Sequence, residues 1–275
     1  MVDSRVIKDM VASALAEDIG AGDVSANIIP KDLHVNAVLI TREDAVLCGT
    51  QWVEEVFRVL DAQVSLKWRH QDGDTVHAGH ELCVLEGPAH ALLTGERVAL
   101  NFLQTLSGTA TRTRRYVDQV RDTGARILDT RKTIPGWRLA QKYAVTCGGG
   151  VNHRMGLFDA MLLKENHIAA AGSIRAAAAT ARAVHPGLLL EVEVEHLSQL
   201  DEVLASGVDR ILLDNFAIEE IRAAVRVIAG RCPIEVSGGV TLENVRAVAK
   251  TGVSFISIGD ITKNVIALDL SVRFR

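Results

Sequence analysis

Hydrophobic and polar positions in the first ninety residues form short stretches of the kind seen in β-strands. Such stretches cover residues 35–41, 63–69 and 81–86 and are rich in Val, Ile and Leu. Turn-forming residues break the pattern, with Asp-Gly-Asp at 72–74 and Gly-Pro at 87–88. We therefore expect three β-strands joined by tight turns in this part of the chain.

Two other stretches show the period of an amphipathic helix. The apolar residues of 52–60 fit a helix between two of the strands, and those of 94–123 fit a longer one. Ser107-Gly108 interrupts the second pattern and predicts either a break or a point of close packing. The first hundred residues are thus expected to form a mixed α/β domain.

Beyond residue 126 the pattern changes to short apolar runs that end in polar residues. They recur roughly every 20 to 35 residues, and the segments between them are helix-compatible and rich in Ala and Arg. This rhythm predicts a parallel β/α barrel-like domain of six or seven strands, which need not close. The runs cover residues 127–130, 161–164, 188–195, 211–214, 234–237 and 255–260.

These patterns divide the chain into two expected domains. The small mixed α/β domain comprises residues 1–107, and the β/α barrel-like catalytic domain comprises 108–264. Residues 268–274 alternate like a strand, so we expect the C-terminal segment 265–275 to return and pair with the small domain.

Composition and charge limit the possible partners. The chain has 275 residues, is 48% hydrophobic and 23% charged, and is therefore of ordinary globular type. With 34 acidic and 30 basic side chains the net charge is −4, which would attract neither nucleic acid nor an anionic membrane. An anionic small ligand would need a local cluster of cations.

The amino-terminal pattern and the cysteines suggest a cytoplasmic protein. Residues 1–20 interleave charged and apolar side chains, unlike a signal peptide, and no apolar run approaches the roughly 20 residues of a membrane span. The four cysteines, Cys48, Cys83, Cys147 and Cys232, are widely spaced and form no C-x-x-C pair. Cys147 precedes a glycine run, and we expect an inert buried side chain there rather than a nucleophile.

Cationic residues gather where the first two barrel runs end and in the segment between them. Because the carboxyl ends of parallel barrel strands meet at one mouth, these side chains are expected to share a pocket. A cluster of this kind predicts a ligand with several anionic groups. Its members are Arg131, Lys132, His153, Arg154, Lys164 and His167.

Three carboxylates follow one another at every second position of the third run. Glu191, Glu193 and Glu195 would share one strand face, and Asp214 ends the next run. Inward-facing acids could bind sugar hydroxyls or Mg²⁺, or stabilise a cation, and we favour this interpretation. A solvated strand face is the alternative, above all for Glu191 and Glu195.

The last two runs end in turns that contain glycine. Ser237, Gly238 and Gly239 follow one run, and Gly259 lies in the other. Loops after the final strands of a barrel commonly bind phosphate through backbone N–H groups. A phosphate site at these turns is therefore expected.

Together these motifs resemble the quinolinate phosphoribosyltransferase family, nearly from end to end. The strings are DTRKTIPG at 129–136, GGGVNHR at 148–154, LKENH at 163–167, EVEVE at 191–195 and LDN at 213–215. The resemblance implies an enzyme of NAD biosynthesis. It would join quinolinate to phosphoribosyl pyrophosphate with Mg²⁺ as cofactor, giving nicotinate mononucleotide, pyrophosphate and CO₂.

The resemblance also implies roles for individual residues. The quinolinate-binding residues would be Arg97, Arg131, His153, Arg154 and Lys164. Catalytic roles would belong to Lys132, which lies near both substrates, and to Glu193 and Asp214, which hold the ribose hydroxyls or their Mg²⁺. The 5′-phosphate would be held by Ser237, Gly238, Gly239 and Gly259.

The family further implies a homodimer with shared sites. The small domain of one subunit covers the barrel mouth of the other, and Arg97 would be supplied to the partner's site. One residue departs from the expected pattern, because Asp260 follows Gly259 where a small residue is expected. An acid there would repel phosphate, so Asp260 is expected to turn away or to contact metal.

Three other functions compete with this assignment. A related molybdenum-transport-type barrel protein would lack the lysine at position 164. A Schiff-base aldolase would use Lys164 as its nucleophile, although the dense Arg and His cluster disfavours it. A lipoyl-like carrier domain over 72–88 would need a lysine in its turn, which the sequence does not provide.

Overall fold

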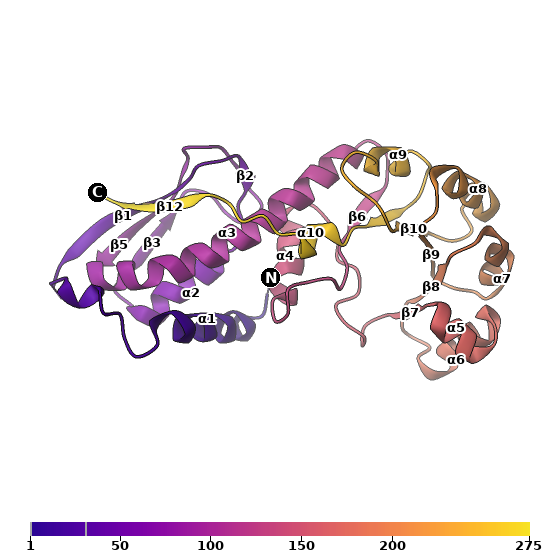
Figure 1. The fold of residues 1–275 in the computed structure, drawn as a ribbon, viewed down its shortest axis with the longest axis horizontal. Helices are drawn as coiled ribbons and strands as arrows, with labels where there is room; N and C mark the ends of the chain where they lie inside the picture. Colours follow the sequence, from indigo (N-terminus) through magenta and orange to yellow (C-terminus); the bar gives the residue numbers. More distant parts are fainter. Residues whose placement is uncertain (1, 31) are drawn as a thin grey trace. The chain divides into compact units, whose positions relative to one another are not determined.

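The structure is a computed structural model that describes residues 2–30 and 32–275. The chain folds into two compact units (Figure 1). Unit 1 comprises Met1–Arg114, Leu139–Gly149 and Asn264–Arg275, and unit 2 comprises Arg115–Arg138 and Gly150–Lys263. The expected domain boundaries at 107/108 and 264/265 stay predictions.

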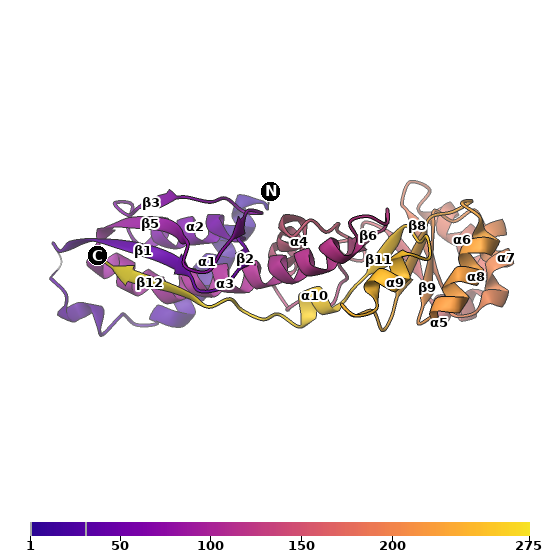
Figure 2. The same cartoon turned by 90° about the horizontal axis from the view of Figure 1, so that it is seen from above.

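Unit 1 is built on a four-stranded antiparallel sheet with the strand order β12-β1-β5-β3 (Figure 2). Its strands are β1 (His34–Thr41), β3 (Ser65–Trp68), β5 (Glu81–Pro88) and β12 (Leu270–Phe274). The three strands expected near the amino terminus are present. The C-terminal strand pairs with β1, with Leu39 opposite Val272, as its alternating pattern predicts. A separate small pair joins β2 (Ala45–Val46) to β4 (Thr75–Val76).

Helices complete unit 1, and their buried residues follow the helical period. In α1 (Ser4–Ile19) the buried side chains are Ile7, Val11 and Leu15, four residues apart, and the Asp3 side chain caps the helix by accepting from the N–H of Arg5. The helices predicted at 52–60 and 94–123 correspond to α2 (Thr50–Leu60) and α3 (Ala89–Val120). The last two helical segments are α4 (Arg138–Cys147) and the short η1 (Ala26–Ile28).

Ser107-Gly108 marks close packing and no break. Helix α3 continues through both residues. A Cβ atom at Gly108 would collide with the carbonyl oxygen of Ile266, so only glycine lets the chain pass here. Ser107 is fully buried and its Oγ bonds the backbone of Cys48.

Unit 2 contains a six-stranded parallel sheet with the order β6-β11-β10-β9-β8-β7. Each predicted apolar run contains one of its strands, so the predicted fold class is confirmed. The strands are β6 (Arg126–Leu128), β7 (Met161–Leu163), β8 (Leu190–Val194), β9 (Arg210–Asp214), β10 (Ile234–Ser237) and β11 (Phe255–Ser257). Among the described residues no strand pairing joins β6 to β7, so the sheet is open there.

Helical segments follow these strands along the chain, as in βα units. They are α5 (Glu165–Ala171), α6 (Ile174–Val184), η2 (Leu197–Gln199), α7 (Leu200–Ala205), α8 (Ile218–Ile228), α9 (Val245–Ala249) and α10 (Asp260–Lys263). The parallel register aligns the carboxyl ends of the strands, with Ser237 opposite Asp214. None of the described helices has the length and apolar character needed to cross a membrane.

Candidate functional site

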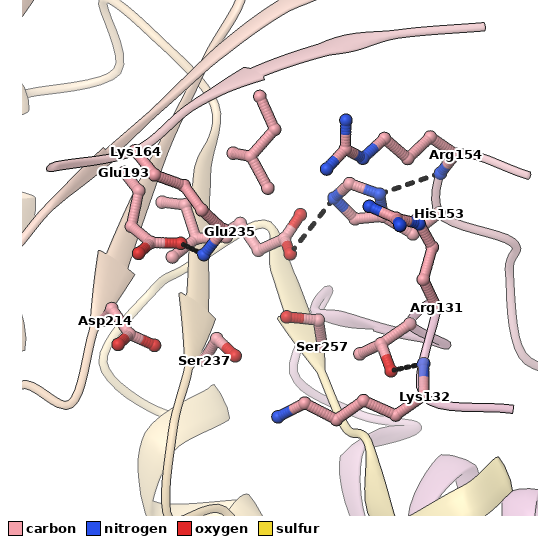
Figure 3. A pocket seen from close by; sticks show the side chains of 13 residues that line it. Arg131, Lys132, His153, Arg154, Lys164, Glu193, Asp214, Glu235, Ser237 and Ser257 are labelled. Atoms are coloured by element: carbon pink, nitrogen blue, oxygen red, sulfur yellow. Dashed lines mark hydrogen bonds and ion pairs between the residues drawn. The ribbon is translucent and has the colours of Figure 1, made fainter. Parts of the chain in front are cut away.

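A cavity of about 440 Å³ opens at the carboxyl ends of the unit 2 strands (Figure 3). All of its lining residues belong to unit 2. Eleven of them carry polar or charged side chains, and the other two are leucines. The lining is Thr130, Arg131, Lys132, His153, Arg154, Leu162, Lys164, Glu193, Leu212, Asp214, Glu235, Ser237 and Ser257.

Lysine 164 forms the closest ion pair of the cavity. Its Nζ lies 2.5 Å from Oε2 of Glu193, and the Lys164 side chain is 44% exposed whereas that of Glu193 is 8% exposed. Burial raises the pKa of Glu193 above its usual value, although Lys164 opposes the rise. In this structure the Lys164 side chain is thus engaged with a carboxylate of the protein.

Two arginines lie next to one another on the opposite wall. Burial and the neighbouring Arg131 lower the pKa of Arg154 from its ordinary value. Arg154 also donates from Nη1 to the carbonyl oxygen of Ala160, at 3.3 Å. Two guanidinium groups kept this close favour a ligand with more than one negative charge, because such a ligand offsets their mutual repulsion.

Two fully buried glutamates line the sheet beneath these cations. Glu191 and Glu235 are 0% exposed. Arg210 pairs with Glu235 at 2.9 Å, while Nε2 of His153 lies 2.9 Å from Glu191 and 3.5 Å from Glu235. Carboxylates so buried persist only with such cationic partners.

Histidine 153 uses both ring nitrogens on groups of the protein. Nε2 faces the two glutamates, and Nδ1 accepts from the backbone N–H of Arg154 at 2.7 Å (Figure 3). Burial lowers the pKa of His153, but Glu191 and Glu235 outweigh it and raise the pKa to about 9. A proton on Nδ1 would have to displace the Arg154 N–H, so that contact opposes the rise. His153 thereby holds the backbone of Arg154 at the cavity wall.

Eight of the predicted site residues line this one cavity. They are Arg131, Lys132, His153, Arg154, Lys164, Glu193, Asp214 and Ser237. Gly259 adjoins it, because a Cβ atom there would lie 2.8 Å from Cδ of Lys132. Gly238 and Gly239 have positive φ angles of 90° and 60° and line a neighbouring pocket with Asn215 instead. Arg97 is an exposed residue of α3 in unit 1.

Three further acids and one histidine considered in the sequence have defined positions in the structure. Glu191 is buried, so a solvated position is wrong for it, but Glu195 follows the end of β8 and is exposed. Asp260 accepts a hydrogen bond from the Tyr116 hydroxyl at 3.1 Å. His167 accepts from the N–H of Lys164 at 3.1 Å and does not line the cavity.

Sequence reasoning did not single out Glu235, Ser257 or Thr130, which also line the cavity. Glu235 stands within an apolar strand run, and a lone acid in such a run is the signal that could have marked it. Ser257 and Thr130 carry no comparable signal, because small hydroxyl residues are common at any strand end.

Comparison with known families accounts for almost the whole chain. The model for the quinolinate phosphoribosyl transferase C-terminal domain matches residues 109–273, and that for the N-terminal domain of the same family matches residues 23–107. The chain belongs to the quinolinate phosphoribosyl transferase family. The family motifs at 129–136, 148–154 and 163–167 are those that contribute the cavity cations.

Individual relatives agree with this family assignment. A probable nicotinate-nucleotide pyrophosphorylase [carboxylating] of Bacillus subtilis is 41% identical over 97% of this chain and 92% of its own length. The nicotinate-nucleotide pyrophosphorylase [carboxylating] of Mycobacterium leprae is 42% identical over 96% of both proteins. Both names describe carboxylating pyrophosphorylases, and neither describes a transport protein or an aldolase.

Solved structures of the same kind superpose closely. The nicotinate-nucleotide pyrophosphorylase of Francisella tularensis has a TM-score of 0.97 and 44% identity, covering 100% of this chain and 98% of its own. NadC of Streptococcus pyogenes gives a TM-score of 0.96 and 40% identity over 100% and 99% of the two chains. The fold of both units is therefore that of this phosphoribosyl transferase family.

Proposed function

We propose that this chain transfers phosphoribosyl from phosphoribosyl pyrophosphate to quinolinate with decarboxylation, giving nicotinate mononucleotide, pyrophosphate and CO₂. The protein is a phosphoribosyltransferase of NAD biosynthesis, as its family and relatives indicate. The observation that carries the choice of substrate is the pair of adjacent guanidinium groups, Arg131 and Arg154, across the cavity from Lys164. Quinolinate presents two neighbouring carboxylates, which match such a set of cations.

The residues around the cavity suggest how each substrate is held. Arg131, Arg154 and Lys164 bind the quinolinate carboxylates, and His153 supports this wall through its contact with Arg154. Lys132 extends from the loop after β6 and serves both substrates. When Lys164 turns toward a carboxylate of quinolinate, it releases the carboxylate of Glu193, which then binds the ribose. Each residue of the ion pair thus serves one substrate.

The carboxylates on the other side suggest the route of group transfer. Departure of pyrophosphate builds positive charge at the anomeric carbon, and Glu193 and Asp214 stabilise that charge. The pyridine nitrogen then attacks the same carbon. Once that nitrogen is quaternary, the adjacent ring carbon can hold the electron pair left by CO₂ until a proton from water takes its place, and no separate organic cofactor is needed.

Mg²⁺ is part of this proposal. Carboxylate oxygens are the ligands that Mg²⁺ prefers, and Glu193 and Asp214 both line the cavity, so the donor set fits. Asp214 Oδ2 accepts from Nδ2 of Asn215 at 2.7 Å, which orients the carboxylate. Mg²⁺ bound here would neutralise charge on the departing pyrophosphate. These two acids would hold it directly or through the ribose hydroxyls.

The 5′-phosphate is assigned to the turns that follow β10 and β11. Ser237 lines the cavity and Gly259 adjoins it, while Gly238 and Gly239 follow Ser237 and line the neighbouring pocket. The positive φ angles of Gly238 and Gly239 leave backbone N–H groups available at a turn where a side chain would strain the chain. Asp260 points to Tyr116, which keeps this acid from the phosphate.

Two further elements of the proposal concern the assembly and its location. The protein acts as a homodimer in which Arg97 is supplied to the partner's site, and it works in the cytoplasm. Support for the first comes from Arg97, which is an exposed cation outside the unit that holds the cavity.

Substrate choice tests the proposed reaction. The purified protein is incubated with phosphoribosyl pyrophosphate, Mg²⁺ and either quinolinate or nicotinate, and CO₂ and nicotinate mononucleotide are measured. Nicotinate should react far more slowly, because it lacks one carboxylate and leaves the cations of Arg131, Arg154 and Lys164 partly unpaired. Comparable turnover of the two acids would refute the assignment.

Complementation tests the shared site. Arg97→Ala and Lys164→Ala should each be inactive alone, but their co-expression should restore activity in heterodimers that contain one intact site. If subunit exchange is verified and no activity returns, Arg97 does not act in the partner's site.

A further inference from the structure

Two cysteines of unit 1 lie side by side although the sequence separates them widely. Cys48 precedes α2, and Cys147 is the last residue of α4. Their Sγ atoms and a carboxylate oxygen of Asp72 lie within 4.8 Å of one another, and both cysteines are free thiols. The fold therefore brings two reduced sulfur atoms into one cluster.

The two thiols differ in their access to solvent. Cys48 is 0% exposed, and its backbone N–H donates to Ser107 Oγ at 2.9 Å. Cys147 is partly exposed, so the buried position expected from the sequence is wrong for it. A reagent from solvent therefore reaches Cys147 before it reaches Cys48.

The surroundings also divide the two thiols chemically. Hydrogen bonds from Cys48 and Tyr143 lower the pKa of Cys147, although burial opposes this. Burial raises the pKa of Cys48 well above its usual value. The thiolate is the reactive form of cysteine, so the more accessible sulfur is also the better nucleophile.

Asp72 is already engaged by other groups, which argues against a metal ion in this cluster. Its Oδ1 accepts from the N–H groups of Gly49 and Thr50 at 3.0 and 3.1 Å, at the start of α2. Its Oδ2 accepts from the Tyr143 hydroxyl at 2.9 Å. Asp72 thus caps a helix and holds Tyr143, and two sulfur atoms remain as the reactive part.

We propose that Cys147 and Cys48 form a peroxide-reactive site that closes into an intramolecular disulfide. The Cys147 thiolate attacks one oxygen of hydrogen peroxide, so that an S–O bond forms, the O–O bond breaks and hydroxide leaves. Cys48 then attacks the sulfenic sulfur of Cys147. The S–S bond forms, the S–O bond breaks, and the departing hydroxide leaves as water with the Cys48 proton. Two thiols are oxidised and one peroxide is reduced to two waters.

The other two cysteines provide internal controls. Burial raises the pKa of Cys83 to about 12 and also raises that of Cys232, and each is buried. Neither belongs to the Cys48, Asp72 and Cys147 cluster. Solvent access and the ease of forming a thiolate, rather than the presence of a cysteine alone, therefore determine which thiol reacts.

Peptide mapping of the full-length protein tests the proposal. After treatment with hydrogen peroxide and blocking of free thiols, non-reducing mass spectrometry should show a peptide that links Cys48 to Cys147, and dithiothreitol should remove it. Cys83→Ser and Cys232→Ser should leave the link unchanged. In Cys48→Ser, Cys147 should instead be trapped by dimedone as the sulfenic acid.

Alkylation gives a second readout that requires no substitution. In the folded wild-type protein at neutral pH, iodoacetamide should modify Cys147 at least about tenfold faster than Cys83 or Cys232. Its rate should rise with pH through a midpoint below the ordinary thiol value of 9.0.

Three results would overturn the proposal. They are a Cys147 that stays reduced while Cys83 or Cys232 oxidises, a disulfide found only between two molecules, and equal alkylation of all four thiols. Stoichiometric Zn²⁺ binding that Asp72→Asn abolishes would assign the cluster to a metal instead.

Discussion

The sheets of the two units differ in the kind of side chain that they bury. In unit 1, β1 and β5 bury Leu39 and Leu85, each 1% exposed, and neither strand buries a charged side chain. In unit 2, β8 and β10 bury Glu191 and Glu235 at 0% exposure, and Glu193 is 7% exposed. The unit 1 sheet buries uncharged side chains, whereas the unit 2 sheet also buries charged ones.

Physical chemistry explains why this difference is tolerated. A buried carboxylate without a partner costs several kcal/mol, so each of these three buried glutamates needs a cation nearby. Lys164, His153 and Arg210 provide those cations. Replacing such pairs by apolar side chains is often neutral or stabilising, so stability alone does not explain them. Their arrangement around a cavity indicates that binding is the reason.

The largest expected effect comes from breaking one of these buried pairs. Glu235→Ala would leave Arg210 without its carboxylate, and we expect the free energy of unfolding to fall by about 3–5 kcal/mol. Chemical denaturation measures the change. Glu86→Ala, at the half-exposed ion pair with Lys67 in unit 1, should change stability by under about 1 kcal/mol. Equal losses of stability in the two variants would contradict the difference between the buried ion pairs of unit 2 and the exposed pair of unit 1.

The next effect separates binding from stability within unit 2. Lys164→Ala removes a cavity cation and should lower kcat/KM for quinolinate by about 100-fold or more. Lys67→Ala serves as the matched control, because its side chain is 72% exposed on the unit 1 sheet. Steady-state assays of nicotinate mononucleotide formation provide the numbers. A Lys164→Ala variant with wild-type kcat/KM would mean that the cavity is not where quinolinate is held.

Packing in unit 1 should give a smaller effect on stability. Gly108→Ala would push a methyl group against the carbonyl oxygen of Ile266, and we expect a loss of about 1–3 kcal/mol. At Gly187, where a Cβ atom would meet nothing within 4 Å, the same substitution should be nearly neutral. Thermal unfolding of both variants makes the comparison. A stabilised Gly108→Ala protein would contradict the close packing.

The smallest expected effect is a pH dependence specific to unit 2. The pKa of His153 is raised from 6.5 to about 9 in the folded protein. Its contribution to stability is therefore complete below about pH 6.5 and is lost as the pH rises toward 9. We expect a decline of about 1 kcal/mol over this interval, reduced by the Arg154 N–H contact. His153→Gln should flatten this decline in denaturation experiments, and an unchanged slope would exclude His153 as its source.

Much of the fold could be predicted from the chain because its signals are local. The six apolar runs of unit 2 each hold one strand, since a run of that length with polar residues at its end is typical of a βα unit. Ser107-Gly108 was ambiguous for a physical reason. A glycine in a helical pattern marks either a break or a close contact, and only the position of Ile266 distinguishes them.

The site residues that lie at strand ends or in family motifs could be predicted from the sequence. Eight of its residues lie together because parallel strands end at one edge. Period 2 placed Glu191, Glu193 and Glu195 on one face, but it could not tell which of them is buried. Strand β8 ends at Val194, so Glu195 is exposed.

The sequence by itself determined the order of the strands and helices, the family, and the cations at the strand ends, because each depends on residues close together in the chain. The tertiary structure alone decided that Glu235 faces His153, that His153 Nδ1 accepts from the Arg154 N–H, and that Cys48 lies beside Cys147. Two of these contacts join distant segments, and the third depends on a ring orientation. No local pattern of apolar and polar residues encodes such distances, since they arise only when separate strands and helices pack together.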